Sequence, residues 1–377
     1  MKKMPSALTC CLFYCIFATT GGWIQAGEID PQHGTNDPDG KTVWYDSVLF
    51  SLAGKGWTNT ESFYDRLPAT AKTAVPKDVW DLSHDTTGMY LQFSTDATTL
   101  EVRWALVRND LGLPHMPSTG VSGVDLYVKD KQGAWVFHAN GRPRYVTKNK
   151  AHFSVSPGAT YRLYLPLFNG IKSMALGIPK NNRFTTPGPA DAPPRKPIVF
   201  YGTSITQGGC ASRPGMAATA IVSRRLDWPI INLGFSGSGR MEPALADLLS
   251  ELDPALYVLD CLANMTPNMV TDRVEPFVKI LRKAHPTTPI LLVEESNFEH
   301  LSPTEKGTLL QTIQTKLVKE GDTHLHFLSN EGMLGNDYEG TVDGLHPNDL
   351  GMMRQADVFI KTLPALLSSP LQNGITP

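Results

Sequence analysis

The chain has 377 residues, of which 41% are hydrophobic and 19% are charged. Domains usually hold about 150 residues, so this length predicts two domains and a short extension. The 34 basic and 36 acidic side chains give a net charge of -2. The chain therefore has no excess of positive charge with which to bind a phosphate backbone, which argues against nucleic acid as a partner. The 32 glycines and 29 prolines favour a loop-rich α/β or β protein over a helical bundle or coiled coil.

Residues 1–26 have the pattern of a cleavable signal peptide. Lys2 and Lys3 precede an apolar run over 8–18 that is too short to span a bilayer, and small and polar residues follow it. We expect cleavage after Ala26, export to the periplasm or the medium, and no stable membrane insertion afterwards. An uncleaved N-terminal anchor is the alternative interpretation.

The cysteines divide between this leader and the rest of the chain. Cys10, Cys11 and Cys15 fall in the leader, which leaves Cys210 and Cys261. Two cysteines in an oxidising compartment can form a disulfide. Buried cysteines also behave as small hydrophobic residues, so two free thiols are an equal alternative.

Residues 27–180 show the pattern of antiparallel sheets. Apolar and polar residues alternate with period two over 100–104 and 161–165. Together with similar runs, about seven short strands and no long helical pattern predict a β-sandwich or jelly-roll domain. Prolines gather after this region, and we interpret 181–196 as an interdomain linker.

Residues 197–377 alternate strands and helices instead. Continuous apolar runs lie at 198–201, 230–233, 256–259, 290–293 and 325–328, with helical segments between them. This order predicts a parallel sheet with helices on both faces. Reactive groups in such sheets collect at the carboxyl ends of the strands, so the chemistry is expected in the loops after these runs.

These loops carry the residue types of a serine hydrolase. Ser204 follows the first run, and a serine hydroxyl becomes a good nucleophile only when a base removes its proton. His346, just before the last helical segment, is the candidate base. Asp343, three residues earlier, can orient the imidazole and stabilise the imidazolium that forms.

An alkoxide forms when a serine attacks an ester, and it needs hydrogen-bond donors that are already in place. The candidate donors are the backbone N–H groups of Ser204 and Gly237 and the side-chain amide of Asn264, which follow the first three runs. We expect glycine at 237 because a side chain there would crowd the reacting carbonyl.

The segments that carry Ser204, Gly237, Asn264 and the pair Asp343 and His346 follow one another in this order. In this order they resemble the four conserved sequence blocks of the SGNH hydrolases, or GDSL-type esterases, over residues 197–368. The resemblance implies a flavodoxin-like α/β/α fold, a triad of Ser204, Asp343 and His346, and an oxyanion hole of Ser204, Gly237 and Asn264. Independently of the resemblance, the sequence has no Gly-rich phosphate loop with a lysine, and its two remaining cysteines have no nearby histidine, so we expect no cofactor and no metal.

Two departures from the family pattern affect the expected pocket. Thr203 stands where the family usually has Asp, and Leu262-Ala263-Asn264-Met265 replaces the usual Gly-x-Asn-Asp. The first departure predicts a change in loop hydrogen bonding rather than a loss of activity. The second leaves the pocket shape and the acyl-chain length open.

The upstream region carries its own resemblance. Gly123-Val124-Asp125-Leu126-Tyr127, after Leu113-Pro114-His115-Met116-Pro117, looks like the β-sandwich of a two-domain branch of these esterases, many of them from polysaccharide-degrading bacteria. We interpret Asp125 as a strand-end or turn residue. The sandwich is expected to wall the substrate groove. His115 and Trp57 are candidate contributors, with an ordinary surface or core position as the alternative for each.

Two further features have structural interpretations as well. Arg213 is a candidate contact for an anionic substrate group, with a structural hydrogen bond as the alternative. His324 and His326 point to one face of a predicted strand without a third ligand, so they do not indicate a metal site.

The combined prediction is an exported serine esterase. It would hydrolyse O-acyl esters, with O-acetyl preferred, on a carbohydrate or related small alcohol through an acyl-Ser204 intermediate. The alternatives are an acyltransferase, a lipase or thioesterase of the same fold, and a carbohydrate-binding protein with an inactive hydrolase domain. The oligomeric state stays open.

Overall fold

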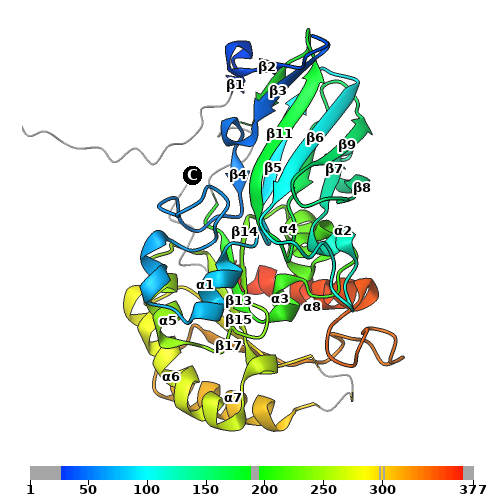
Figure 1. Cartoon of the computed structure of the whole chain (residues 1–377). Coiled ribbons are helices and arrows are strands. Elements are labelled where there is room, and N and C mark those ends of the chain that lie inside the picture. The colour runs from blue at the N-terminus through cyan, green and yellow to red at the C-terminus, as the bar shows by residue number, and fades with distance from the viewer. Residues whose placement is uncertain (1–26, 188–194, 297–298, 300–301, 368–377) are drawn as a thin grey trace, which may run out of the picture.

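The computed structural model describes residues 27–187, 195–296, 299 and 302–367. Antiparallel sheets form the upper part of the molecule, and a parallel sheet with its helices forms the lower part (Figure 1). The predicted signal peptide lies outside the described residues. Among the helices of the described part, none is both long and apolar enough to cross a membrane.

The upper part is the predicted β-sandwich. One sheet has the order β1-β12-β5-β10-β7-β8 with β4 beside β5, and the other has the order β2-β3-β11-β6-β9. Alternate residues of β6 are buried, as the period-two pattern predicts. The strands are β1 (Gly27–Glu28), β2 (Thr35–Asn36), β3 (Thr42–Asp46), β4 (Leu52–Ala53), β5 (Tyr90–Thr95), β6 (Thr99–Leu106), β7 (Val124–Lys129), β8 (Trp135–Gly141), β9 (Asn149–Ser154), β10 (Thr160–Tyr164), β11 (Ile171–Pro179) and β12 (Phe184–Thr186).

The sandwich extends beyond its predicted end. β12 lies within the predicted linker 181–196, yet it pairs with both β1 and β5. Phe184 is fully buried and its ring packs edge-on against Phe50. The sandwich therefore reaches Thr186, because a buried aromatic residue ties this segment to the core before the prolines begin.

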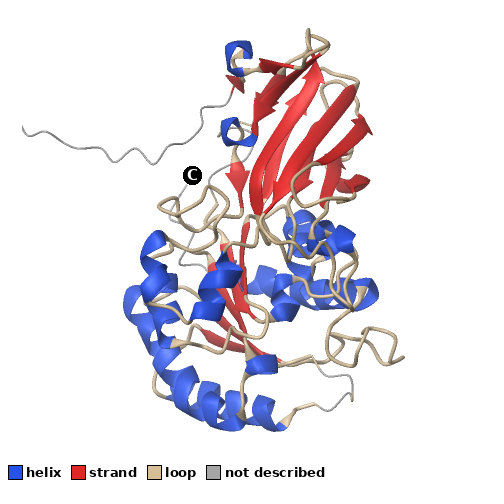
Figure 2. Ribbon diagram, in the orientation of Figure 1, coloured by secondary structure: helices blue, strands red, loops and turns tan. Residues whose placement is uncertain are grey.

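The lower part is the predicted parallel sheet, with the order β14-β13-β15-β16-β17. Helices cover both faces (Figure 2). The strands are β13 (Ile198–Gly202), β14 (Ile230–Gly234), β15 (Leu256–Asp260), β16 (Ile290–Val293) and β17 (Leu325–Leu328). The helices in the described part of the chain are α1 (Lys77–Ser83), α2 (Ser118–Val121), α3 (Ser204–Gln207), α4 (Ala218–Leu226), α5 (Pro243–Ser250), α6 (Pro267–Ala284), α7 (Glu305–Lys319) and α8 (Asp349–Leu367), with short 3-10 turns η1 (Pro31–His33), η2 (Ser47–Leu49), η3 (Ala69–Thr73), η4 (Pro214–Met216) and η5 (Leu262–Asn264).

Alternate side chains of β13 pack into the two hydrophobic cores on opposite faces of the parallel sheet. Val199 and Tyr201 lie in the core that includes residues of α5, α6 and α7, whereas Ile198 and Phe200 lie in the core that includes residues of α4 and α8. A central strand that is apolar on both faces is the signature of a doubly covered parallel sheet.

The segment between β4 and β5 leaves the sandwich and packs on the lower domain. Trp57, Leu67 and Trp80 belong to the same buried core as α5 and α6. The Trp57 indole N–H donates to Glu251 at 2.9 Å, at the end of α5. Trp57 is therefore a core residue at the domain interface, which is the alternative interpretation of it, and it does not line a substrate groove.

The sequence pattern around Asp125 lies at a second contact between the domains. Asp125 is fully buried inside β7, and its Oδ2 accepts hydrogen bonds from Arg213 Nη1 and the Gly215 N–H, both at 2.9 Å. Asp125 is the second residue of β7, so its interpretation as a strand-end residue is confirmed, and its buried carboxylate also joins the two domains. Arg213 also donates to the Tyr127 hydroxyl at 2.6 Å, so the structural alternative for this arginine is confirmed.

Asp125→Ala is expected to lower the free energy of unfolding by about 3 kcal/mol, because it leaves the largely buried Arg213 and the Gly215 N–H without their acceptor. Urea unfolding followed by tryptophan fluorescence measures this loss. Asp253→Ala is the control: it breaks the exposed pair with Lys196 and should cost less than about 1 kcal/mol. Equal losses in the two variants would show that Asp125 does not hold the domains together.

Candidate active site

Three of the predicted loops start at the same edge of the parallel sheet. Gly202, the last residue of β13, pairs with Gly234 at the end of β14 and with Asp260 at the end of β15. The loops that carry Ser204, Gly237 and Asn264 therefore leave the sheet side by side, as the position of the apolar runs predicts.

Ser204 is the first residue of α3, and its neighbours fix this turn. The Thr203 side chain caps the helix by accepting a hydrogen bond from the Ile205 N–H at 3.2 Å. Thr203 is thus an N-cap, a position that suits threonine as well as aspartate. Gly202 is needed because a Cβ there would lie 2.4 Å from the Asp260 carbonyl oxygen.

Ser204, His346 and Asp343 form a continuous chain of hydrogen bonds. Ser204 Oγ lies 2.9 Å from His346 Nε2, and His346 Nδ1 lies 2.8 Å from Asp343 Oδ2. Burial raises the pKa of Asp343, but hydrogen bonds from the His346 backbone and ring and from the Leu345 N–H outweigh it and hold that pKa below its ordinary value. The carboxylate therefore stays charged beside the imidazole.

The loop of Asp343 and His346 is held by its own backbone. The His346 N–H donates to Asp343 Oδ1 at 2.7 Å, and the Val342 N–H donates to the His346 carbonyl at 3.0 Å. A bridge between Thr341 and Pro347 closes the loop. The spacing of three residues thus gives a preorganised pair.

Two of the three candidate oxyanion donors, Gly237 and Asn264, lie on loops that are tied together. Asn264, at the end of η5, donates a side-chain N–H to the Ser238 carbonyl at 2.5 Å, and its amide carries a second N–H. Gly237, next to Ser238, has a φ of +69°. An added Cβ at Gly237 would meet no atom within 4 Å, so the structure requires glycine for its backbone conformation and not for space within the protein.

Comparison with known proteins agrees with this geometry. Residues 195–364 match the model of the GDSL-like lipase/acylhydrolase family, and residues 42–184 match that of the N-terminus of SGNH-hydrolase-type esterases. A crystal structure of a GDSL-like lipase from Bacteroides ovatus is 31% identical, with a TM-score of 0.79 over 86% of this chain and 98% of that chain. The chain belongs to the GDSL-like lipase/acylhydrolase family. It is a carboxylic ester hydrolase.

Two more distant structures share the fold of this GDSL hydrolase. One is the salicylyl-acyltransferase SsfX3 from a tetracycline biosynthetic pathway, 19% identical, with a TM-score of 0.69 over 90% of this chain and 98% of that chain. The other is a family two carbohydrate esterase from Clostridium thermocellum, 14% identical, with a TM-score of 0.51 over 74% and 93% of the two chains. No curated protein matches the chain.

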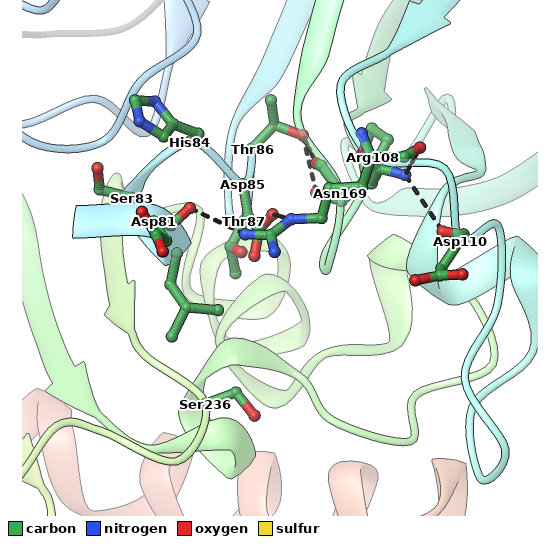
Figure 3. A network of polar contacts seen from close by, with 12 residues as sticks. Asp81, Ser83, His84, Asp85, Thr86, Thr87, Arg108, Asp110, Asn169 and Ser236 are labelled. Atoms are coloured by element: carbon green, nitrogen blue, oxygen red, sulfur yellow. Dashed lines mark hydrogen bonds and ion pairs between the residues drawn. The ribbon is translucent and has the colours of Figure 1, made fainter. Parts of the chain in front are cut away.

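In the GDSL hydrolase, the loop after β14 that carries Gly237 is supported by residues that belong to no sequence motif. Gln207, in α3, accepts a hydrogen bond from the Ser236 N–H at 2.8 Å and donates to the buried Asp85 at 3.1 Å. Asp85 also accepts from Arg108 Nε at 2.9 Å. Figure 3 shows Asp85 and Arg108 in this network beside the loop that carries Ser236. The loop of Gly237 is thus braced from the N-terminal domain.

Arg66 holds the same loop from another side. Its guanidinium is fully buried, donates to the Gly234 carbonyl at 2.7 Å and to the Asp85 carbonyl at 2.9 Å, and lies 4.6 Å from the centre of the Phe235 ring. Burial lowers the pKa of Arg66 to about 10. No local pattern marks Arg66 or Asp85, because the partners that connect them to this loop, Gly234 and Gln207, lie in the other domain.

Gln207→Ala is expected to lower kcat of the GDSL hydrolase by about 10- to 100-fold with little change in KM, because small misplacements of donor groups have costs of this size. Steady-state kinetics on a small ester measures the split. The affinity for a boronate inhibitor, which mimics the tetrahedral intermediate, should fall in parallel. Gln314→Ala is the control: Gln314 lies in α7, and its substitution removes a hydrogen bond to the carbonyl of Leu325 in β17. A rise in KM alone would argue against a positioning role for Gln207.

The cysteines and His115 complete the surroundings of the site. Cys210 and Cys261 are both free, buried thiols, so the alternative of two free thiols is confirmed and the disulfide is not formed. The Cys261 thiol faces the Tyr201 carbonyl in the core, whereas Cys210 lies near the triad. Burial raises the pKa of Cys210 to about 12.

The ring of His115, from the N-terminal domain, lies 5.4 Å from that of His346, so this domain reaches the site as expected.

Proposed function

We propose that this GDSL hydrolase is an exported serine esterase that removes O-acyl groups, preferably acetyl, from a carbohydrate or related small alcohol. The observation that carries the proposal is the chain of hydrogen bonds from Ser204 through His346 to Asp343 at the carboxyl edge of the parallel sheet. Ser204 is nearly buried within α3, and His346 is in position to remove its proton.

The proposed mechanism follows from this geometry. His346 Nε2 accepts the proton of Ser204 as Oγ attacks the ester carbonyl, and Asp343 stabilises the imidazolium. The backbone N–H groups of Ser204 and Gly237 and the Asn264 amide are the proposed donors to the alkoxide. The imidazolium then gives its proton to the leaving alcohol, and a water molecule, activated by His346, hydrolyses the acyl-serine.

The substrate class is supported by several separate observations. The fold is shared with a family two carbohydrate esterase described in complex with cellohexaose. The loop of His346 lies at the surface, with Leu345 exposed, which suits a large alcohol outside the acyl pocket. The signal-peptide pattern of residues 1–26 supports export.

The experiment is acetate release from acetylated xylan and from acetylated monosaccharides by the mature chain, with Ser204→Ala beside it. The proposal expects release by the mature chain and none by the variant. Equal release by both would contradict Ser204 as the nucleophile. No release by either, with hydrolysis of longer acyl esters, would contradict the deacetylase and favour a lipase or thioesterase.

An acyltransferase is the second candidate, because the fold matches SsfX3 over nine tenths of this chain. Transfer would use the same acyl-serine and differ only in the acceptor. Adding alcohols or sugars to the assay separates the two. A transfer product formed in preference to free acid would favour the transferase.

A further inference from the structure

Three side chains that commonly bind transition metals meet beside the triad. They are His115 from the N-terminal domain, Cys210 from the loop after α3, and His346. One ligand atom from each lies within 4.8 Å of the others. Sequence patterns do not reveal this cluster, because its members come from separate loops and two domains.

The position of Cys210 is unusual. Its φ is +70°, a conformation that costs an L-amino acid about 1–2 kcal/mol. The turn is fixed by the Gly209 N–H, which donates to the Ser204 carbonyl at 2.7 Å, and by the Ala211 N–H, which donates to the Gly208 carbonyl at 3.1 Å. In the part of the chain that the structure describes, the Cys210 thiol forms no hydrogen bond, whereas the Cys261 thiol does. Backbone strain thus places an unpartnered sulfur at the site.

His115 can adjust while its loop stays in place. The Leu113 and Met116 backbones bond to each other at 2.9 and 3.1 Å, and the Met116 side chain is buried. The His115 ring itself is exposed. Rotation of this ring can therefore bring a nitrogen closer to Cys210 and His346 without moving the backbone.

We propose that His115, Cys210 and His346 form a binding site for a zinc-type divalent cation, and that its occupation inhibits the esterase. Two imidazoles and one thiolate are a ligand set that suits Zn²⁺ and leave its fourth position open. Around a tetrahedral Zn²⁺ with bonds of 2.0–2.3 Å the ligand atoms lie about 3.3–3.6 Å apart, so a separation of 4.8 Å must shorten by about 1.2–1.5 Å. The thiol proton leaves to solvent, and no electron is transferred.

Inhibition follows from the atoms of His346. Its Nδ1 is held by Asp343 at 2.8 Å, so Nε2 is the atom left to bind a metal. A carboxylate on the other ring nitrogen is the usual arrangement of a zinc-bound histidine. The same Nε2 lies 2.9 Å from Ser204 Oγ and must accept its proton, so a cation on this lone pair removes the base. The inhibitory effect rests on the proposed function, whereas metal binding does not.

The first test of the site uses no substrate. Co²⁺ is added to the mature chain, and the near-ultraviolet band of a thiolate bound to cobalt is recorded. The band is expected in the wild type and in Cys261→Ser, and it should be absent in Cys210→Ser. A band that persists in Cys210→Ser, or no band in the wild type, would overturn the proposal whether or not the chain hydrolyses esters.

The second test measures ester hydrolysis in buffered Zn²⁺, relative to the metal-free activity of each variant. His115→Ala and Cys210→Ser are expected to raise the concentration for half-inhibition more than about tenfold, because even partners outside the ligand set affect metal affinity 10- to 100-fold. His138→Ala, an exposed histidine that bonds to the Ser154 carbonyl, and Cys261→Ser are the controls. His115 is exposed, so its variant keeps the test valid if Cys210→Ser fails to fold. Unchanged inhibition in His115→Ala would contradict the proposal.

Discussion

Replacing Ser204 by alanine is expected to lower kcat for a small aryl acetate by about 10⁴- to 10⁶-fold, while KM changes little. The substitution removes only the attacking oxygen, since Ser204 lies in a helix turn that Thr203 caps. The proposed oxyanion donors and the rest of the site remain, so we expect weak residual catalysis from substrate binding and electrostatic stabilisation. Steady-state kinetics with a burst-phase measurement checks both numbers.

The control for this prediction is a comparison of single and double variants of Ser204 and His346, whose effects on kcat are not expected to add. His346→Ala should cost about as much as Ser204→Ala, and the double variant should be no slower, because the two side chains act as one unit. Ser212→Ala, in the loop after α3, removes a hydroxyl that donates to Asp349 and should change kcat less than about tenfold. A fluorophosphonate that labels the Ser204→Ala variant as fast as the wild type would show that another residue is the nucleophile.

The position of the site could be predicted because it depends on patterns that are local. Apolar runs identify the strands of a parallel sheet, and polar residues directly after them must meet at its carboxyl edge. Gly202, Gly234 and Asp260 confirm this by their shared register. The close spacing of Asp343 and His346 also predicts their contact, because three residues of tight loop leave few other geometries.

The supports of the site could not be predicted in the same way. Asp125 and Asp85 look like ordinary polar residues of strands or turns, since nothing nearby in the sequence shows that Arg213 or Gln207 will meet them across the domain interface. The predicted boundary at 181 lies too early in the chain, because prolines dominate the segment that follows it, whereas one buried residue, Phe184, keeps 184–186 in the sandwich.

Replacing Asn264 by alanine is expected to lower kcat by about 100- to 1000-fold, which is the usual cost of losing one oxyanion donor. The amide has two N–H groups, and one already donates to the Ser238 carbonyl. The substitution therefore removes the proposed donor to the alkoxide and also the hydrogen bond that ties the loop of Asn264 to the loop of Gly237. Kinetics on the same aryl acetate measures the sum of these two effects.

The Asn264→Asp variant separates these effects, because aspartate has nearly the same shape but donates no hydrogen bond when ionised. If Asn264 stabilises the alkoxide, a negative charge beside it should make this variant slower than Asn264→Ala. The affinity for a boronate inhibitor should fall in the same order, with KM for the ester nearly constant. If both variants lose less than about tenfold in kcat, the N–H groups of Ser204 and Gly237 suffice, and Asn264 serves only to hold Ser238.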